Sequence, residues 1–179
     1  RDKETAHAGI EASLTGHLVL STLHTNSAPE TITRLLDLGL DPVNFSDACV
    51  GILAQRLIQT LCPECKTSYI ASADELAFIE RQYGSAVINE LSLSQPVTLY
   101  QANGCEHCGD IGYKGRTGVH ELLRMTPELL SSISANSNVS ELAKQASQDG
   151  MRTLMQDGIK KVLSGITDIK QIQILGGVD

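Results

Sequence analysis

The sequence predicts an α/β fold that carries a small metal-binding insert and a helical C-terminal region. An apolar run over residues 18–23 follows Gly16 and is flanked by segments with helical spacing, which is typical of a strand buried beneath helices. Two Cys-x-x-Cys pairs enclose a segment with a helical pattern of its own. After residue 126, apolar residues recur at helical spacing almost to the end of the chain, which predicts a run of helices.

Length and composition limit the possible classes of protein. The 179 residues suit one domain, or one domain with an insert. Hydrophobic residues make up 41% of the chain, enough for a core, but no segment approaches the roughly 20 apolar residues of a membrane span. The 14 basic and 21 acidic residues give a net charge of −7, which argues against nucleic-acid binding through overall charge. The chain enters a helical pattern without a signal sequence, and we expect it to be part of a longer protein.

A cluster of polar residues closes the apolar run, at Ser21, Thr22, His24, Thr25 and Asn26. In open α/β sheets, ligands bind just beyond the carboxyl ends of the strands. This position favours His24 as a ligand-contacting residue, although a histidine that only caps or packs gives the same pattern.

The other elements are predicted from periodicity and from helix caps. Ser27 with Glu30 and Ser72 with Glu75 have the spacing of capping boxes, and Thr126 and Asn138 are further N-caps. The predicted helices span residues 2–14, 27–39, 44–54 and 72–87. Further helices begin at Thr126 and Asn138, with Gly150 and Gly158 as breaks or close contacts and an end at Gly165, and a last helix spans residues 166–175. Further strands span residues 55–61 and 119–123.

The most specific chemical signal is the pair of Cys-x-x-Cys motifs at Cys62, Cys65, Cys105 and Cys108. Each motif lets two thiolates reach one ion, and two motifs complete the tetrahedral shell of a structural zinc site. A redox dithiol needs only one motif at a helix start, and disulfides need an oxidising compartment. With four thiolates the site has no open position for water.

Two further residues are alternative ligands. His107 lies between two of the cysteines and is expected to face solvent or to support the ligands rather than to replace one. Cys49 falls in an apolar helical pattern and is expected to be a small core residue. Because metal binding at such a site contributes folding energy, loss of the metal should unfold residues 62–108 and leave the helical tail folded.

Several motifs together resemble a known family. Residues 1–6 resemble the segment after its Walker B glutamate, and residues 12–26 resemble its His box. Further similar segments are residues 33–37, 54–57 and 112–122 and the four cysteines. The whole chain is similar to the C-terminal half of the secretion ATPases that drive type II secretion and type IV pilus assembly, in the branch that carries the tetracysteine.

The resemblance implies an organisation and a cellular role. It implies that residues 1–61 are the C-terminal portion of a RecA-like P-loop ATPase core, that residues 62–108 are the zinc-binding insert, and that residues 109–179 return to the core and end in helices. It also implies a cytoplasmic homo-hexamer, peripheral to the inner membrane through platform proteins, that hydrolyses ATP with magnesium.

The resemblance also assigns roles to single residues. His24 matches the His-box residue that senses the γ-phosphate and is the catalytic candidate. His17, Thr25, Asn26, Arg56 and Arg1 are weaker candidates for nucleotide or intersubunit contacts. A surface salt bridge is the alternative for the two arginines.

The chain has no GxxxxGK[ST] loop and lacks the acidic part of Walker B, so phosphoryl transfer would lack its phosphate cradle and its metal-holding carboxylates. This fragment alone should therefore not hydrolyse ATP. Two other classes stay open. One is a free-standing zinc-binding interaction module, and the other is a hydrolase built on His24 or His120, although no serine has a nucleophile-elbow pattern.

Overall fold

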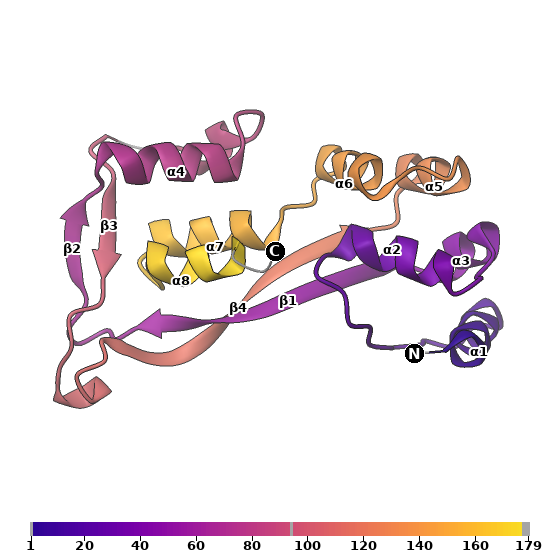
Figure 1. The fold of residues 1–179 in the computed structure, drawn as a ribbon, viewed down its shortest axis with the longest axis horizontal. Helices are drawn as coiled ribbons and strands as arrows, with labels where there is room; N and C mark the ends of the chain where they lie inside the picture. The colour runs from indigo at the N-terminus through magenta and orange to yellow at the C-terminus, as the bar shows by residue number, and fades with distance from the viewer. Residues whose placement is uncertain (1, 94, 177–179) are drawn as a thin grey trace. The chain divides into compact units, whose positions relative to one another are not determined.

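The computed structural model describes residues 2–93 and 95–176, which form two compact units. The first unit runs to Ala54 and resumes at Glu121–Arg152, and the second comprises Gln55–His120 and the chain from Thr153 onward. Strand β1 (Gly51–Leu61) pairs with β4 (Tyr113–Arg124), and the boundary between the units falls within both strands. A second pair joins β2 (Thr67–Ile70) to β3 (Thr98–Gln101) in antiparallel register (Figure 1).

The first unit consists mainly of helices that share one core. These are α1 (Lys3–Leu14), α2 (Ala28–Asp37), α3 (Pro42–Ala48), α5 (Pro127–Ser134) and α6 (Val139–Gln148). Helix α2 packs against α6, and α3 packs against α1 and α5. The buried core residues are Ala28, Ile32, Leu40, Phe45, Leu123, Leu129, Ile133, Leu142, Ala146 and Met151. Since Leu123 belongs to β4, the core also fixes the end of that strand.

The second unit combines the β2–β3 pair with α4 (Ala73–Tyr83), α7 (Leu154–Leu163) and α8 (Ile169–Gln173). Short 3-10 turns lie at η1 (Ile88–Leu91), η2 (Glu106–Cys108) and η3 (Ile174–Gly176). Helix α7 packs against α4, α8 and β3. The buried core residues are Ile58, Ile79, Tyr83, Val97, Leu99, Val119, Ile159, Val162, Ile169 and Ile172.

The four predicted N-caps are confirmed. The side chains of Ser27, Ser72, Thr126 and Asn138 each accept a backbone N–H three residues later, at the first turns of α2, α4, α5 and α6. Ser72 and Asn138 form complete capping boxes. At Ser27 the box is half formed, because the Glu30 carboxylate accepts instead from the backbone N–H of Asn26. The strands predicted over 55–61 and 119–123 lie within longer strands, β1 and β4.

The buried strand predicted over residues 18–23 is absent, which corrects that prediction. Residues 17–25 connect α1 to α2 without regular structure, and the side chains of Leu18 and Leu20 are 84% and 88% exposed. A strand needs a neighbour whose backbone groups accept and donate its hydrogen bonds. Within residues 2–93 and 95–176, no strand pairs with this segment. The apolar run therefore has the composition of a strand but no partner.

The helix predicted over residues 44–54 is also wrong in its second half. Helix α3 ends at Ala48, and β1 begins at Gly51. Here β4 passes close by: a Cβ on Gly51 would lie 3.0 Å from the Leu123 carbonyl oxygen. The spacing of Ile52 and Leu53 fits a helix or a strand, and pairing with β4 decides for the strand. The last predicted helix is shorter than expected, because α8 begins after its N-cap, Asp168.

The compact units do not follow the boundaries at residues 61/62 and 108/109 that the sequence suggested. Helices α7 and α8 pack with α4 and β3 in one core, although they lie beyond the predicted insert. The division into an ATPase-core part, a zinc-binding insert and a C-terminal part that returns to the core stays a prediction. Among the described residues, no helix combines the length and the hydropathy that a membrane span requires.

Candidate functional site

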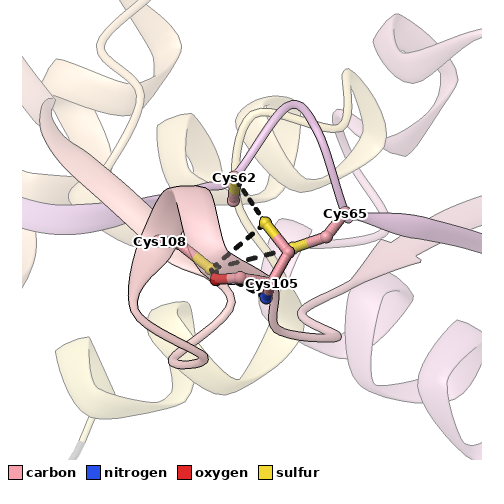
Figure 2. A group of neighbouring side chains, drawn as sticks. All are labelled: Cys62, Cys65, Cys105 and Cys108. Carbon is pink, nitrogen blue, oxygen red and sulfur yellow. Dashed lines mark hydrogen bonds between the residues drawn. The ribbon is translucent and has the colours of Figure 1, made fainter.

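The four cysteines that the sequence singled out come together in the second unit (Figure 2). Cys62 directly follows β1, and Cys65 lies in the turn before β2. Cys105 and Cys108 lie at η2, before β4. Cys62 and Cys108 are buried and the other two are partly buried. Folding thus joins two short turns that are distant in the chain. Cys62 and Cys105 are 43 residues apart in sequence, and so are Cys65 and Cys108.

The spacing of the sulfur atoms fits one tetrahedral metal ion. The Sγ atoms of Cys62 and Cys105 are 3.9 Å apart, as are those of Cys65 and Cys108, and the Cys105–Cys108 distance is 3.8 Å. All four Sγ atoms lie within 4.8 Å of one another. Metal–thiolate bonds of about 2.3 Å in a regular tetrahedron place the sulfurs about 3.8 Å apart. The donor set and its size therefore match a closed four-thiolate site.

Backbone hydrogen bonds hold the two turns in place. The Cys62 N–H donates to the Gly112 carbonyl oxygen at 2.9 Å, which ties the end of β1 to the segment before β4. The Asp110 N–H donates to the Cys105 carbonyl oxygen at 2.9 Å and closes the second turn. The Gly104 N–H points at the Cys65 Sγ, 3.3 Å away. Such donors orient thiolate ligands and stabilise their charge.

The electrostatic environment differs between the thiols. Burial raises the pKa of Cys65 to about 11. Burial acts in the same direction on Cys108, but the backbone N–H groups of Cys105 and Gly112, at 3.3 and 3.2 Å from its Sγ, outweigh it and lower the pKa of Cys108 to about 7. Cys108 is therefore more readily ionised than Cys65, and a thiolate is the form that binds a cation.

The alternative ligands do not join the cluster. His107 is exposed, and its Nδ1 lies 3.4 Å from the Lys114 ammonium. Cys49 packs against the core of the first unit, where burial raises its pKa. In the described part of the chain, no disulfide joins any cysteine. Convergence of both motifs on one point favours a metal over a redox dithiol, which would use a single motif.

The second candidate site is the segment that contains His24. His24 is exposed and lies just before α2, in the first unit. The hydroxyls of Thr25 and Thr31 are 2.6 Å apart, and the Asn26 N–H donates to the Glu30 carboxylate at 2.9 Å. The residues after His24 are thus bonded to the first turn of α2. His24 itself belongs to the irregular segment before the N-cap of α2, and it does not end a strand.

The other residues that the sequence grouped with His24 are placed differently. His17 stays at the C-terminal end of α1, where its Nδ1 lies 3.2 Å from the Ala12 carbonyl oxygen. Arg56 is an exposed residue of β1 in the second unit. Arg1 lies outside the described residues. His120 lies on β4 with its Nδ1 3.8 Å from Asp157, whose carboxylate is paired with Lys161 at 2.6 Å. That group links β4 to α7.

Comparison with known proteins decides the family. The family model described as type II/IV secretion system protein matches residues 1–174. The chain belongs to this family.

Its relatives in the secretion family are much longer proteins. The type IV pilus assembly ATPase TfpB of Acinetobacter baylyi is 39% identical over 96% of this chain and 28% of its own length. The type II secretion system protein E of Pseudomonas aeruginosa is 42% identical over 96% of this chain and 32% of its own length. For the type IV pilus assembly ATPase PilB of Thermus thermophilus, the values are 42%, 96% and 18%. This chain spans less than a third of each of them.

A solved structure supports the fold of this secretion-family chain. The X-ray structure of the Legionella pneumophila ATPase DotB aligns with a TM-score of 0.58 and covers 100% of this chain and 37% of that chain. At 19% identity the likeness concerns the fold alone. The expected class, an α/β C-terminal part of a secretion ATPase with a cysteine cluster and C-terminal helices, is confirmed.

Sequence reasoning missed one polar residue of the first unit, Glu121. It is 4% exposed, and its Oε1 accepts a 2.7 Å hydrogen bond from the Ala28 N–H at the start of α2. The strand alternation contained the signal. Val119 and Leu123 are buried, so a glutamate between them at the same phase had to face inward.

Proposed function

We propose that this chain is the C-terminal part of a motor that hydrolyses ATP with magnesium and powers protein secretion or pilus assembly. The observation that carries the proposal is the 39–42% identity, over 96% of the chain, to pilus assembly ATPases and to type II secretion system protein E. The motor would act as a cytoplasmic homo-hexamer, held at the inner membrane by platform proteins.

In this proposal His24 contacts the γ-phosphate of ATP. A ring that donates one hydrogen bond to an oxygen gaining negative charge stabilises the transition state more than bound ATP. The ordered start of α2 supports this role, because it holds the residues next to His24. Thr25, Asn26, His17, Arg56 and Arg1 are weaker candidates for contacts with nucleotide or a neighbouring subunit.

The four cysteines would hold a structural zinc ion. Four thiolates fill the coordination shell, so the metal would stabilise the second unit and would take no part in hydrolysis. On this proposal the zinc-bearing unit is one part of the motor and not a free-standing interaction module.

The decisive test measures phosphate release by the full-length protein and by the 179-residue chain. We expect magnesium-dependent hydrolysis by the full-length protein and none by the chain, which has no phosphate-binding loop. A full-length protein without such activity would contradict the motor proposal. Hydrolysis by the chain alone would contradict the assignment of catalysis to the missing motifs.

A further inference from the structure

We propose that Glu121 is a positioning residue for His24 and acts through the N-terminus of α2. The inference rests on the proposed role of His24 in ATP hydrolysis. Glu121 comes from β4, 93 positions after the residue that it contacts. The connection is therefore made only by the tertiary fold.

The first step is the bond between Glu121 and α2. Its Oε1 accepts the Ala28 N–H at 2.7 Å, and Ala28 is fully buried at the first position of the helix. Burying a carboxylate is unfavourable unless charged hydrogen bonds and the positive end of a helix compensate for it. This geometry supplies both of those terms. The carboxylate and the helix start thus hold each other in one arrangement.

The second step links the start of α2 to His24. The three residues after His24 each bond to the first turn of the helix: Thr25 through the Thr31 hydroxyl at 2.6 Å, Asn26 through the Glu30 carboxylate at 2.9 Å, and Ser27 through the Glu30 N–H at 3.3 Å. Thr31 also donates to the Ser27 carbonyl oxygen at 3.1 Å. A shift of the first turn would therefore carry this segment with it.

The third step concerns rigidity. Glu121 sits on a strand whose next inward residue, Leu123, is fully buried in the same core as Ala28 and Ile32. The strand and the helix that the carboxylate connects therefore contribute residues to the same core. Such an anchor can fix the imidazole position without touching the nucleotide.

The test uses the full-length protein with Glu121→Ala and Glu121→Gln. Displacement of a reacting group by a fraction of an ångström to an ångström lowers turnover strongly, so we expect Glu121→Ala to reduce kcat about 10- to 100-fold. The KM for ATP should change less than kcat, because His24 acts on the transition state. Glu121→Gln keeps an acceptor oxygen for Ala28 and should restore most of the rate. Hydrogen exchange at residues 24–31 should rise in Glu121→Ala but not in Glu121→Gln.

A double mutant separates positioning from stability. In a His24→Ala background, Glu121→Ala should cause no further fall in kcat, since both changes remove the same contribution. Independent, multiplying effects would overturn the inference, as would parental turnover in Glu121→Ala. If His24→Ala alone leaves kcat unchanged, the proposed role of His24 fails. Unchanged exchange at residues 24–31 in Glu121→Ala would then refute the anchor as well.

Two further variants guard the result. If Glu121→Ala does not fold, Thr31→Val tests the same link, because it removes the hydroxyl that bonds Thr25 and Ser27. It should lower kcat in the parent and cause no further fall in the His24→Ala background. Parental turnover in Thr31→Val would overturn the inference in that case. Asp41→Ala is the matched control, because Asp41 caps α3 through the N–H groups of Val43 and Asn44 in the same unit. It should lower thermal stability and leave kcat unchanged.

Discussion

The Lys66 ammonium donates a 2.7 Å hydrogen bond to the Gly165 carbonyl oxygen, and it lies 4.8 Å from the centroid of the Tyr100 ring. Lys66 directly follows a cysteine of the cluster, and its N–H donates to the Cys62 carbonyl oxygen at 3.0 Å. Gly165 lies in the turn between α7 and α8. The first cysteine turn and the last helices are therefore parts of one hydrogen-bonded structure.

The first prediction follows from that link. Removing the metal with a chelator should open α7 and α8 together with residues 62–112, while α5 and α6 in the other unit stay protected. This differs from the expectation from sequence that the whole helical tail survives, because α7 and α8 share a core with the cysteine-bearing segment. Hydrogen exchange measured by mass spectrometry reports each helix separately. Protection of α7 and α8 after metal loss would argue against the link.

The metal itself is checked in the same preparations. Elemental analysis should find one zinc ion per chain, and replacing Cys62 and Cys105 with serine should abolish it. Cys49→Ser is the matched control and should keep the metal, since Cys49 packs in the other unit. A metal content near zero in protein made without chelator would remove the zinc site.

The second prediction concerns Gly165. It has φ +68°, and a Cβ there would lie 2.7 Å from the Tyr100 ring. Gly165→Ala should therefore lower the free energy of unfolding by about 1 kcal/mol for the backbone conformation and by a further 1–3 kcal/mol or so for overpacking. Gly109→Ala is the control in the same unit, because its φ of +63° is close to that of Gly165 and nothing lies within 4 Å of the added Cβ. If urea unfolding gave the same loss of unfolding free energy for Gly165→Ala and its control, the Tyr100 ring would be shown to move aside without cost.

The third prediction is a pH dependence of the second unit. The Tyr113 hydroxyl donates to Asp168 at 2.6 Å, and burial, together with that carboxylate, raises the pKa of Tyr113 to about 12 from its ordinary 10.0. A raised pKa in the folded state means that this stabilisation is complete below pH 10 and declines between about pH 10 and 12.

Tyr113→Phe tests the sign of this effect. At neutral pH the variant should lose about 1–3 kcal/mol of unfolding free energy, because the buried Asp168 loses a donor. The gap between parent and variant should narrow as the pH rises above about 10. Urea midpoints across this range give the comparison. A gap that widens with pH would refute the assignment.

The fourth prediction separates the two candidate sites in the full-length protein. His24→Ala should reduce kcat roughly 10²-fold, the lower end of the cost of losing one transition-state donor, with little change in ATP affinity. Cys62→Ser should act through the stability of the second unit, so its remaining activity should keep near-normal affinity. Steady-state hydrolysis and nucleotide titration should be measured in parallel. If His24→Ala kept the parental turnover, the segment around His24 would serve only to start helix α2.

The sequence by itself determined the features that depend on neighbours in the chain. The N-caps at Ser27, Ser72 and Asn138 are formed by side chains that reach N–H groups three residues away, so a short motif contains both partners. The two Cys-x-x-Cys turns likewise contain two candidate ligands each, and this pairing predicts one shared metal ion.

Only the tertiary structure decided the features whose partners are distant in the chain. Leu18 and Leu20 have the composition of a buried strand, but a strand forms only where a neighbour offers backbone hydrogen bonds, and the described residues offer none there. Lys66 is hydrogen-bonded to Gly165, which lies 99 residues away in the sequence, and Glu121 is hydrogen-bonded to Ala28, which lies 93 residues away. No local pattern contains both members of such a pair, because packing of the whole chain brings them together.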